Sequence, residues 1–328
     1  GDWGGENDTA PTTESQWLTA AGLRRRTLEL DANFTLMLGD NIYQHGVADG
    51  DTSSRFADTF EAVYAASTPG RPFYVVAGNH DYGEGVLSNI SSQVAYTQRS
   101  ASWRFPSLWY KVHRDFDTSS GPRSVDILMI DTVVLCGNGD NNEAFIDEEL
   151  RFLGDAFGRA AGQSLRHAAA EAQWAWLQQE LAGSRADYLW TAGHYPIYSA
   201  GIDGPTPCLV DRLLPLLARY AAHHISGHDH MLEHFQHGGV NSFVVGAGKE
   251  CCYSAVNMDQ VPAEDLRYMV AGPAGNESEP PVVGPVLGGF AGLRLGAEFA
   301  ELTFYAHDGR ALHTAPPMQR RSRFPRRQ

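Results

Sequence analysis

Short apolar runs that end in a glycine and then polar residues recur along this chain, and they constrain its fold more than any other feature. Four runs lead directly into a glycine: 33–38 into Gly39, 72–77 into Gly78, 188–192 into Gly193 and 223–226 into Gly227. Runs of this length are typical of buried strands, and in α/β sheets polar side chains gather where strands end. A further run, 125–130, ends at Asp131. The sequence therefore predicts one site at the carboxyl ends of several strands.

Apolar residues at helical spacing lie between these runs, at 15–30, 53–66, 171–182 and 209–222. Strand patterns dominate after residue 243. Alternating strands and helices followed by strand-rich sequence favour a layered α/β architecture with the helices outside. The polar, acidic stretch 138–167 predicts an exposed excursion.

The composition limits the class of protein. The 328 residues are 43% hydrophobic and 20% charged, and the formal net charge is −14, which argues against a nucleic-acid-binding surface. Without a run of 18 apolar residues, no membrane insertion is expected. We expect a single domain over 1–318 and a basic C-terminal tail over 319–328. The chain opens at Gly1 without an initiator methionine, so a processed or trimmed chain is expected.

Four cysteines and four glycosylation sequons point to the secretory pathway. An even number of cysteines is compatible with disulfides without proving them. Adjacent cysteines rarely pair, so Cys251 and Cys252 are predicted to be two thiols. Glycosylation is expected at Asn7, Asn89 and Asn276. A secreted or lysosomal/vacuolar location follows.

The polar residues at the strand ends supply a set of metal-binding side chains. They are Asp2, Asp40, Tyr43, Asn79, His80, His194, His228 and His230. Each alone has an ordinary explanation, as a turn residue or a satisfied core histidine. Together they offer carboxylate, phenol, amide and imidazole donors without a thiolate, a combination that suits iron, manganese or zinc. Two cations about 3.5–4 Å apart need a shared carboxylate and can hold both the attacking and the leaving oxygen at phosphorus.

At this point the sequence resembles a known family. Five blocks match, in order, the five motifs of the calcineurin-like metallophosphoesterases: GDWGG from Gly1, GDNIY from Gly39, GNHD from Gly78, GHYP from Gly193 and GHDH from Gly227. Tyr43, three residues after Asp40, is similar to the purple acid phosphatases, and the likeness to their small, mammalian, tartrate-resistant type runs along the whole chain. The first motif stands without the strand expected before Gly1.

The resemblance implies a four-layer sandwich of two mixed β-sheets flanked by α-helices, with a dinuclear metal site at the carboxyl ends of the strands. It implies that Fe(III) is bound by Asp2, Tyr43 and His230, that a divalent metal (iron, zinc or manganese) is bound by Asn79, His194 and His228, and that Asp40 bridges the two. The implied activity is an acid phosphatase that hydrolyses phosphate monoesters by in-line attack of a metal-activated hydroxide, with His80 facing the phosphate. It also implies a disulfide between Cys136 and Cys208.

The sequence departs from that family at two places. Mammalian-type enzymes carry a histidine where this chain has Asp203, so either Asp203 protonates the leaving group or it is a turn residue and His80 or solvent serves. The stretch 138–167 corresponds to a loop that covers the active site in those enzymes, and here we expect it near the cleft.

The alternative function is a generic manganese or zinc metallophosphoesterase acting on phosphodiesters or nucleotides. The expected partners are phosphate-ester substrates, and the protein is expected to be a monomer.

Overall fold

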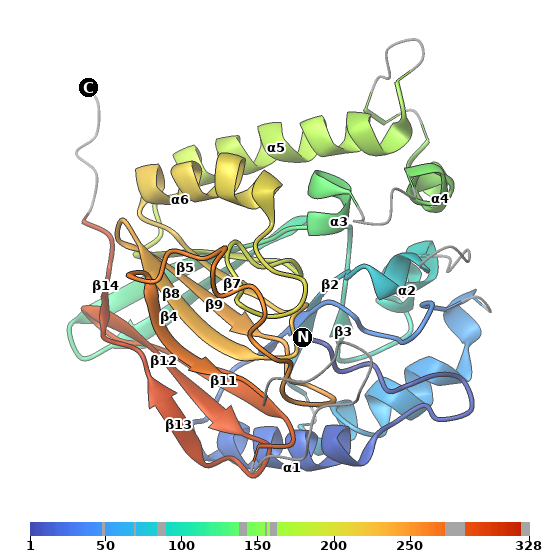
Figure 1. Cartoon of the computed structure of the whole chain (residues 1–328), viewed down its shortest axis with the longest axis horizontal. Helices are drawn as coiled ribbons and strands as arrows, with labels where there is room; N and C mark the ends of the chain where they lie inside the picture. The colour runs from blue at the N-terminus through green and yellow to red at the C-terminus, as the bar shows by residue number, and fades with distance from the viewer. Residues whose placement is uncertain are drawn as a thin grey trace.

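The computed structural model describes residues 1–47, 50–68, 70–83, 90–137, 143–154, 156–157, 163–272 and 286–322. The molecule is layered, with α5 (Leu165–Gly183) and α6 (Leu214–Tyr220) on one side of the strands and α1 (Glu14–Glu29) on the other (Figure 1). The predicted α/β sandwich with outer helices is therefore confirmed.

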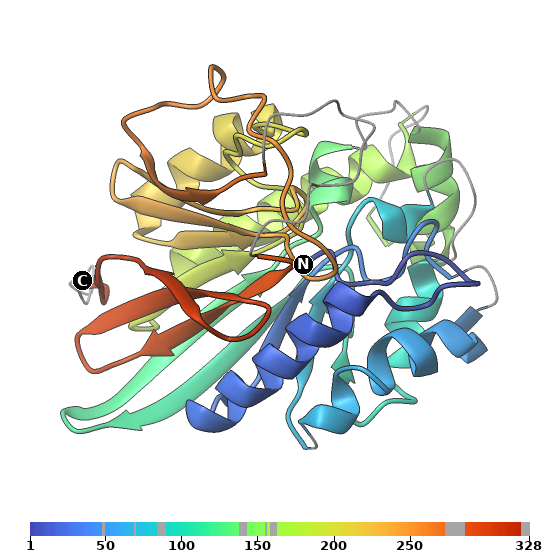
Figure 2. The same ribbon diagram turned by 60° about the horizontal axis from the view of Figure 1, so that its bottom comes forward.

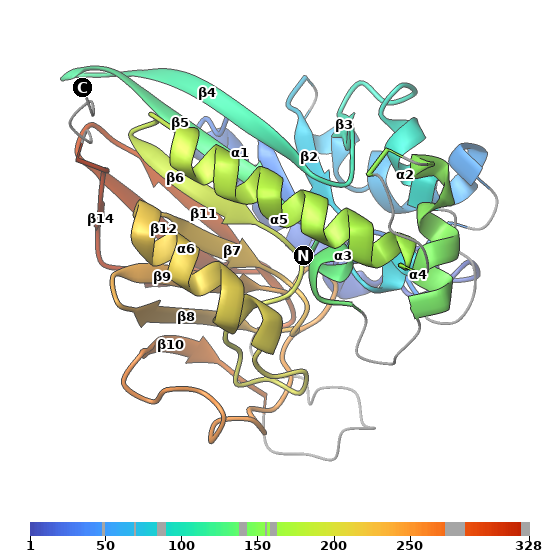
Figure 3. The same cartoon turned by 90° about the horizontal axis from the view of Figure 1, so that it is seen from above.

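A mixed sheet of seven strands forms one inner layer. Its order is β10-β8-β9-β7-β6-β5-β4. The strands are β4 (Tyr110–Thr118), β5 (Gly121–Met129), β6 (Tyr188–Ala192), β7 (His223–Ser226), β8 (Leu232–His237), β9 (Val240–Val245) and β10 (Leu266–Val270). Because β5, β6 and β7 pair in parallel, their carboxyl ends meet at one edge of the sheet. Seen from above, α5 and α6 lie across this sheet (Figure 3).

The second inner layer is divided into two sheets by its hydrogen bonding. One contains three parallel strands, β1 (Thr35–Leu38), β2 (Phe73–Val76) and β3 (Trp103–Arg104). The other is antiparallel and contains β11 (Gly289–Leu295), β12 (Phe299–Ala306), β13 (Ala311–Thr314) and β14 (Met318–Gln319). Helix α1 packs beside β11 on the outer side of this layer (Figure 2).

Apolar side chains fill the space between the two strand layers. Val76 of β2, Met129 of β5, Phe243 of β9 and Phe304 of β12 are all fully buried in one cluster. Full burial of such a side chain stabilises the fold by about 1.5–3 kcal/mol relative to an exposed one. This core holds β1 and β2 against the seven-stranded sheet, so that the ends of strands from both layers face each other.

The N-terminal segment joins the two layers although it forms no strand of its own. The Gly1 ammonium donates to the carbonyl of Val245 at the end of β9 (2.9 Å), and the Asp2 amide donates to the carbonyl of Gly39 after β1 (3.0 Å). In return, the amide of Lys249 donates to the carbonyl of Asp2 (2.7 Å). These bonds place Asp2 where the strand layers meet.

The remaining helices are short. They are η1 (Gly50–Thr52), η2 (Phe56–Glu61), η3 (Ala65–Ser67), η4 (His80–Tyr82), α2 (Ile90–Tyr96), α3 (Thr132–Cys136), α4 (Glu143–Glu149), η5 (Leu150–Leu153) and η6 (Leu209–Leu213). The helix predicted over 53–66 is thus a π-helical turn followed by a 3₁₀ turn. In the described part of the chain, no helix has both the length and the apolar character needed to cross a bilayer.

Two disulfides are present. Cys136 at the end of α3 pairs with Cys208, with 5.6 Å between the Cα atoms, and confirms the expected bond. In the chain-entropy model, closing a loop of this length stabilises a fold by about 4 kcal/mol. Cys251 and Cys252 are also paired, across a cis peptide bond, so the prediction of two thiols is wrong. Adjacency in sequence gives no information on the isomer of the peptide bond between them.

Parts of the predicted excursion (138–167) and of the predicted tail (319–328) pack against the rest of the protein. In the predicted excursion, α4 contacts η4, which contains His80, and the amide of Ile90 donates to the Glu149 carboxylate (2.7 Å). In the predicted tail, Arg320 pairs with Glu298 (2.8 Å) and the Arg321 side chain is buried. Residues 138–142 and 323–328, like the sequons at Asn89 and Asn276, lie outside the described residues.

Candidate metal centre

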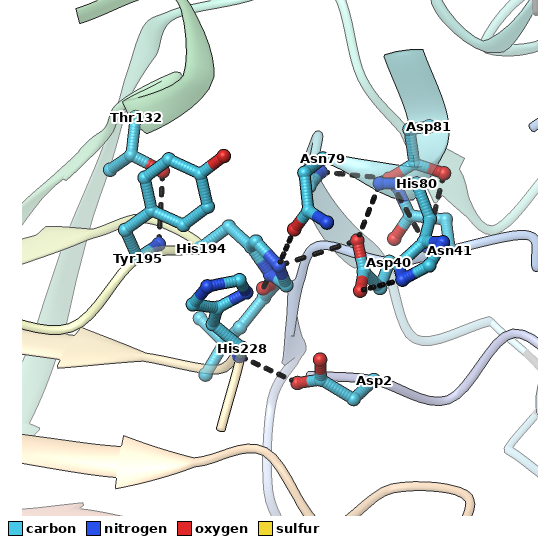
Figure 4. Close-up of polar contacts among 12 residues, drawn as sticks. Asp2, Asp40, Asn41, Asn79, His80, Asp81, Thr132, His194, Tyr195 and His228 are labelled. Carbon is cyan, nitrogen blue, oxygen red and sulfur yellow. Dashed lines mark hydrogen bonds and ion pairs between the residues drawn. The ribbon is translucent and has the colours of Figure 1, made fainter. Parts of the chain in front are cut away.

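The strand ends bring the predicted site residues together, as Figure 4 shows for most of them. Asp40 follows β1, Asn79 follows β2, His194 follows β6, and His228 and His230 follow β7. The ligand atoms of Asp2, Asp40 and His194 all lie within 4.8 Å of one another, and all three side chains are buried. Strand topology, rather than proximity in sequence, therefore creates the site.

Two of the glycines before these residues are required because side chains of the candidate site approach the backbone closely. A Cβ atom on Gly39 would lie 2.5 Å from Nδ1 of His194, and one on Gly78 would collide with the Asp40 carboxylate. Asp2, Asp40 and His228 themselves have positive φ angles of 58°, 49° and 76°. Non-glycine residues in this region cost about 1–3 kcal/mol each, which the surrounding structure must offset.

One group of donors surrounds the phenol oxygen of Tyr43. This oxygen lies 2.8 Å from Oδ2 of Asp40, 3.2 Å from Oδ1 of Asp2 and 3.1 Å from Nε2 of His230. Nε2 of His230 is in turn 3.6 Å from Oδ1 of Asp2. Four side chains from three separate segments thus direct oxygen or nitrogen atoms at a common point.

A second group surrounds Nε2 of His194. This nitrogen lies 2.9 Å from Oδ1 of Asn79 and 3.3 Å from Oδ1 of Asp40. Nδ1 of the same ring is 2.8 Å from the carbonyl oxygen of Leu38, which can only accept, so Nδ1 carries the proton. Burial lowers the pKa of His194, which keeps the ring neutral. Its Nε2 lone pair then faces two oxygen atoms.

This convergence of lone pairs fits a bound cation. Two oxygens and an unprotonated nitrogen within 3.3 Å repel one another unless a positive charge lies between them. The donor set of carboxylate, amide and imidazole suits the transition metals that the sequence predicts. Asp40 takes part in both groups, Oδ2 in the first and Oδ1 in the second.

His228 borders the second group. Its ring centroid lies 4.9 Å from that of His194, and its amide donates to Oδ2 of Asp2 (2.9 Å). Nε2 of His228 is 3.7 Å from Oδ1 of Asp203, which is 39% exposed. Burial opposes the charged imidazole, but the negative charge of Asp203 and the neighbouring carboxylates raises the pKa of His228.

His80 lies at the edge of the first group. Its amide donates to Oδ1 of Asp40 (3.1 Å), and its ring centroid is 4.4 Å from that of Tyr43. Nδ1 is 2.8 Å from the carbonyl oxygen of Gln44 and must donate to it. Nε2, 3.8 Å from Oδ2 of Asp40, is therefore the nitrogen that faces the site.

A set of residues that the sequence analysis did not single out supports the ligands. Buried Asp81 accepts from the amides of Gly78 (2.8 Å) and Asn41 (3.1 Å) and from the side chain of Gln93 (2.8 Å). It thereby ties the loop after β1 to the loop after β2. Asp81 stands beside His80 in the GNHD block, so position within a motif was the available signal.

His230 has supporting contacts of its own. Its Nδ1 lies 2.7 Å from Oε1 of Glu250, and the ring of Tyr253 stacks on it at 4.4 Å. Burial would lower the pKa of His230, but the nearby carboxylates of Asp2 and Glu250 raise it to about 9. A carboxylate behind the ring orients it and increases its basicity as a ligand. No sequence motif marks Glu250.

Burial also keeps the phenol of Tyr43 neutral in the absence of a cation. Removal from solvent raises the pKa of Tyr43 well above its usual value, and the charges of Asp40 and Asp2 add to the effect. The phenolate form therefore requires a positive charge bound beside it.

A buried carboxyl on β8 predicts a pH-dependent stability. Burial raises the pKa of Glu233 to about 8, although Ser199 Oγ (2.7 Å) and the Ala200 amide (3.0 Å) donate to it. The folded protein thus keeps a proton that the unfolded chain, with an ordinary value of 4.5, has already lost. The free energy of unfolding should therefore fall as the pH rises from about 4.5 to about 8.

We expect the Glu233→Gln variant to lose that fall. Its unfolding temperature should match that of the parent protein near pH 4.5 and exceed it near pH 8. Glu264→Gln, a change at an exposed position, serves as the charge-matched control and should follow the parent at every pH. A constant difference between Glu233→Gln and the parent across this range would show that Glu233 does not titrate as expected.

Comparisons with known proteins agree with this geometry. A family model described as calcineurin-like phosphoesterase matches residues 1–232. Tartrate-resistant acid phosphatase type 5 of Homo sapiens is 37% identical over 330 residues, covering 100% of this chain and 90% of that protein. Purple acid phosphatase 7 of Arabidopsis thaliana is 28% identical over 76% of this chain and 68% of its own length.

A solved structure shares the fold. The structure described as GAP50, the anchor in the inner membrane complex of Plasmodium, superposes with a TM-score of 0.74 over 98% of this chain and 87% of that chain, at 20% identity. At that identity the likeness concerns the fold alone. The family model and the full-length relatives establish more: the chain belongs to the calcineurin-like phosphoesterase family, among the relatives named acid phosphatases.

Proposed function

We propose that this chain hydrolyses phosphate monoesters at acid pH, at a dinuclear centre that contains Fe(III) and a divalent metal. The position of Asp40 is the observation that supports the proposal most strongly. Its Oδ2 lies 2.8 Å from the phenol oxygen of Tyr43, and its Oδ1 lies 3.3 Å from Nε2 of His194. A carboxylate whose two oxygens belong to different donor groups is what a pair of cations needs as a bridge.

The proposed ligands divide by chemistry. Asp2, Tyr43 and His230 would hold Fe(III), Asn79, His194 and His228 would hold divalent iron, zinc or manganese, and Asp40 would bridge them. A phenolate is a hard donor that suits a trivalent ion, whereas the uncharged amide of Asn79 suits a divalent, more exchangeable one. When bound, the two ions would offset the charge of the phosphate and lower the pKa of a water to make hydroxide available at acid pH.

The side chain of His80 is placed to contact the substrate. Its amide and ring contacts hold Nε2 beside Asp40, and 18% of the side chain remains exposed. Because Nδ1 already donates to the Gln44 carbonyl, Nε2 carries an N–H only in the imidazolium form, and that form would donate to a phosphate oxygen and stabilise charge that develops during the reaction. In this proposal His80 binds and orients the phosphate group.

Asp203 is the second proposed catalytic residue. Its loop is held in place because its amide donates to Oδ1 of Asp229 (3.2 Å) and the Asn257 side chain donates to the carbonyl of Gly201 (2.6 Å). The carboxyl group itself is exposed beside His228. This placement supports a role in delivering a proton to the departing alcohol.

The Asp203→Asn variant tests that role. General acid catalysis contributes about 10²–10⁴-fold, and it matters most when the leaving group is a poor one. We therefore expect about a 100-fold loss of kcat on alkyl phosphates and little change on nitrophenyl phosphate. Asp203→His, which restores a proton donor, should recover part of the rate on alkyl phosphates. An equal effect of Asp203→Asn on both ester classes would remove Asp203 from the proton transfer.

The proposed function is tested by combining metal analysis, a visible spectrum and substrate comparison on one purified sample. We expect two metal ions per chain, at least one of them iron, a visible absorption band and faster hydrolysis of nitrophenyl phosphate than of the corresponding diester. Zinc or manganese without iron, no visible band and a preference for the diester would instead support a generic metallophosphoesterase.

We also propose that the protein is secreted or lysosomal/vacuolar and works as a monomer. The disulfide between Cys136 and Cys208 supports an oxidising compartment. The sequon at Asn7 is exposed, with the Thr9 hydroxyl donating to Oδ1 of Asn7 (2.7 Å), so it is open to glycosylation.

A further inference from the structure

Lys249 is a buried lysine directly behind the proposed ferric ligands. Its ammonium lies 4.0 Å from the centroid of the Tyr43 ring, and only 5% of its side chain is exposed. Burial of a lysine is costly unless its charge is paired. The molecule offsets that cost with two carboxylates and an aromatic face.

The two carboxylates face the ammonium at equal distances. Oε1 of Glu6 and Oε1 of Glu250 each lie 3.6 Å from Nζ of Lys249. Glu250 also contacts Nδ1 of His230 at 2.7 Å, whereas the Glu6 side chain is 43% exposed. Two carboxylates thus balance the charge of Lys249, and the ammonium also contacts the ring of Tyr43.

The backbone of Lys249 is fixed on both sides. Its amide donates to the carbonyl of Asp2 (2.7 Å), and its carbonyl accepts from the hydroxyl of Thr13, the N-cap residue of α1 (3.0 Å). Gly248 before it has no room for a side chain, because a Cβ would lie 2.5 Å from the carbonyl oxygen of Gly1. The position of the ammonium over the ring is therefore built into the fold.

We propose that Lys249 is a positioning residue for Tyr43 that holds a fixed positive charge against the phenol ring and so sets the electron density of the proposed iron ligand. The attraction between an ammonium and an aromatic face is electrostatic, and it strengthens when the ring carries negative charge. Lys249 thereby stabilises the phenolate form. This inference rests on the proposed function, since it concerns Tyr43 as a ligand of Fe(III).

The consequence is a shift in the visible absorption of the iron-containing protein. The band arises when an electron moves from the phenolate to Fe(III). A positive charge against the ring lowers the energy of the donating electrons more than that of the more distant ion, because Coulomb energy falls with distance. Lys249 therefore moves the band to shorter wavelength, and loss of its charge should move the band to longer wavelength.

The Lys249→Met variant, loaded with iron in the same way as the parent protein, tests the inference. Methionine retains much of the length of the side chain but carries no charge. We expect its absorption maximum at longer wavelength than that of the parent, while Lys249→Arg, which keeps the charge, should absorb close to the parent. A lysine that only fills space would change the unfolding temperature of the metal-free protein and leave the position of the band unchanged.

Glu6→Gln is the second variant, chosen in case Lys249→Met does not fold. Glu6 is partly exposed, and its loss leaves the ammonium less neutralised, so the band should move to shorter wavelength, opposite to Lys249→Met. Bands that stay at the parental wavelength in the iron-loaded variants would overturn the inference and leave the proposed function intact. A parent protein that binds iron without a visible band would overturn both.

Discussion

Replacing Asp40 by asparagine is expected to reduce phosphatase activity by more than about 100-fold and to lower the metal content below two ions per chain. Loss of a residue that merely supports a ligand typically costs about 10–100-fold in metal affinity or activity. Asp40 lies closer to the chemistry, with one oxygen in each donor group. An asparagine fills the same volume but offers only one oxygen and no charge, so two cations cannot share it.

The stability of the metal-free Asp40→Asn variant, unlike its activity, should not decrease. Without cations, the carboxylates of Asp2, Asp40 and Asp81 are buried close together, and burial and then the charge of Asp40 raise the pKa of Asp81 to about 7. Removing one of these charges relieves repulsion. The metal-free Asp40→Asn protein should therefore unfold at the same temperature as the metal-free parent or at a higher one.

Metal analysis, hydrolysis of nitrophenyl phosphate and thermal unfolding on parallel samples check both expectations. Asp115→Asn, which removes one exposed carboxylate from β4, is the matched control for the change in net charge and should resemble the parent. An Asp40→Asn protein that retains two metal ions and normal turnover would contradict the bridging role. A variant that loses activity only because it unfolds would leave that role without support.

The sequence predicted the strand ends well because their signal is local. A buried parallel strand appears in the sequence as a short apolar run, and the glycine after it is required because a side chain of the candidate site leaves no space for a Cβ. Gly39 beside His194 and Gly78 beside Asp40 are examples. The side chains that crowd these glycines are distant in sequence, but the apolar run and its glycine stand next to each other in the chain. The positions of Asp40, Asn79, His194 and His228 could therefore be predicted from the sequence.

Other elements have no such local signal, and the sequence does not predict them correctly. The strand β4 (Tyr110–Thr118) is rich in charged residues because it is an edge strand whose side chains are mostly exposed, so no apolar run marks it. The helix predicted over 53–66 has helical apolar spacing, yet it is interrupted after Glu61. β4 is thus formed by local pairing with β5 without an apolar pattern, whereas the pattern over 53–66 continues past the end of the regular helix.

The residues that support the candidate metal centre could not be predicted from the sequence, for a related reason. Glu250 and Lys249 come from the loop after β9, which follows the last recognisable motif by about 20 residues. They meet His230 and Tyr43 only because the N-terminal segment lies between β1 and β9, where Gly1 and Asp2 bond to both layers. Contacts of this kind depend on the assembled layers, and the pattern of any single segment does not contain them.

Replacing Tyr43 by phenylalanine is expected to remove the visible band while leaving the fold intact. The ring would keep its place against Lys249 and His80, because those contacts involve the ring and not the hydroxyl. The variant would lose the oxygen that lies within 3.2 Å of Asp40, Asp2 and His230. Charge transfer needs an electron-rich phenolate, so its removal should abolish the colour even where iron remains bound.

The proton balance of metal binding gives an independent check on the same residue. Because burial raises the pKa of Tyr43 well above its usual value, the metal-free protein holds a neutral phenol. A trivalent cation bound to the phenolate must displace that proton. Adding gallium(III), which is trivalent and inert to redox change, to the metal-free parent should therefore produce the near-ultraviolet difference spectrum of a phenolate. The Tyr43→Phe protein should show none, and a parent protein that bound gallium without this signal would exclude Tyr43 as the ligand.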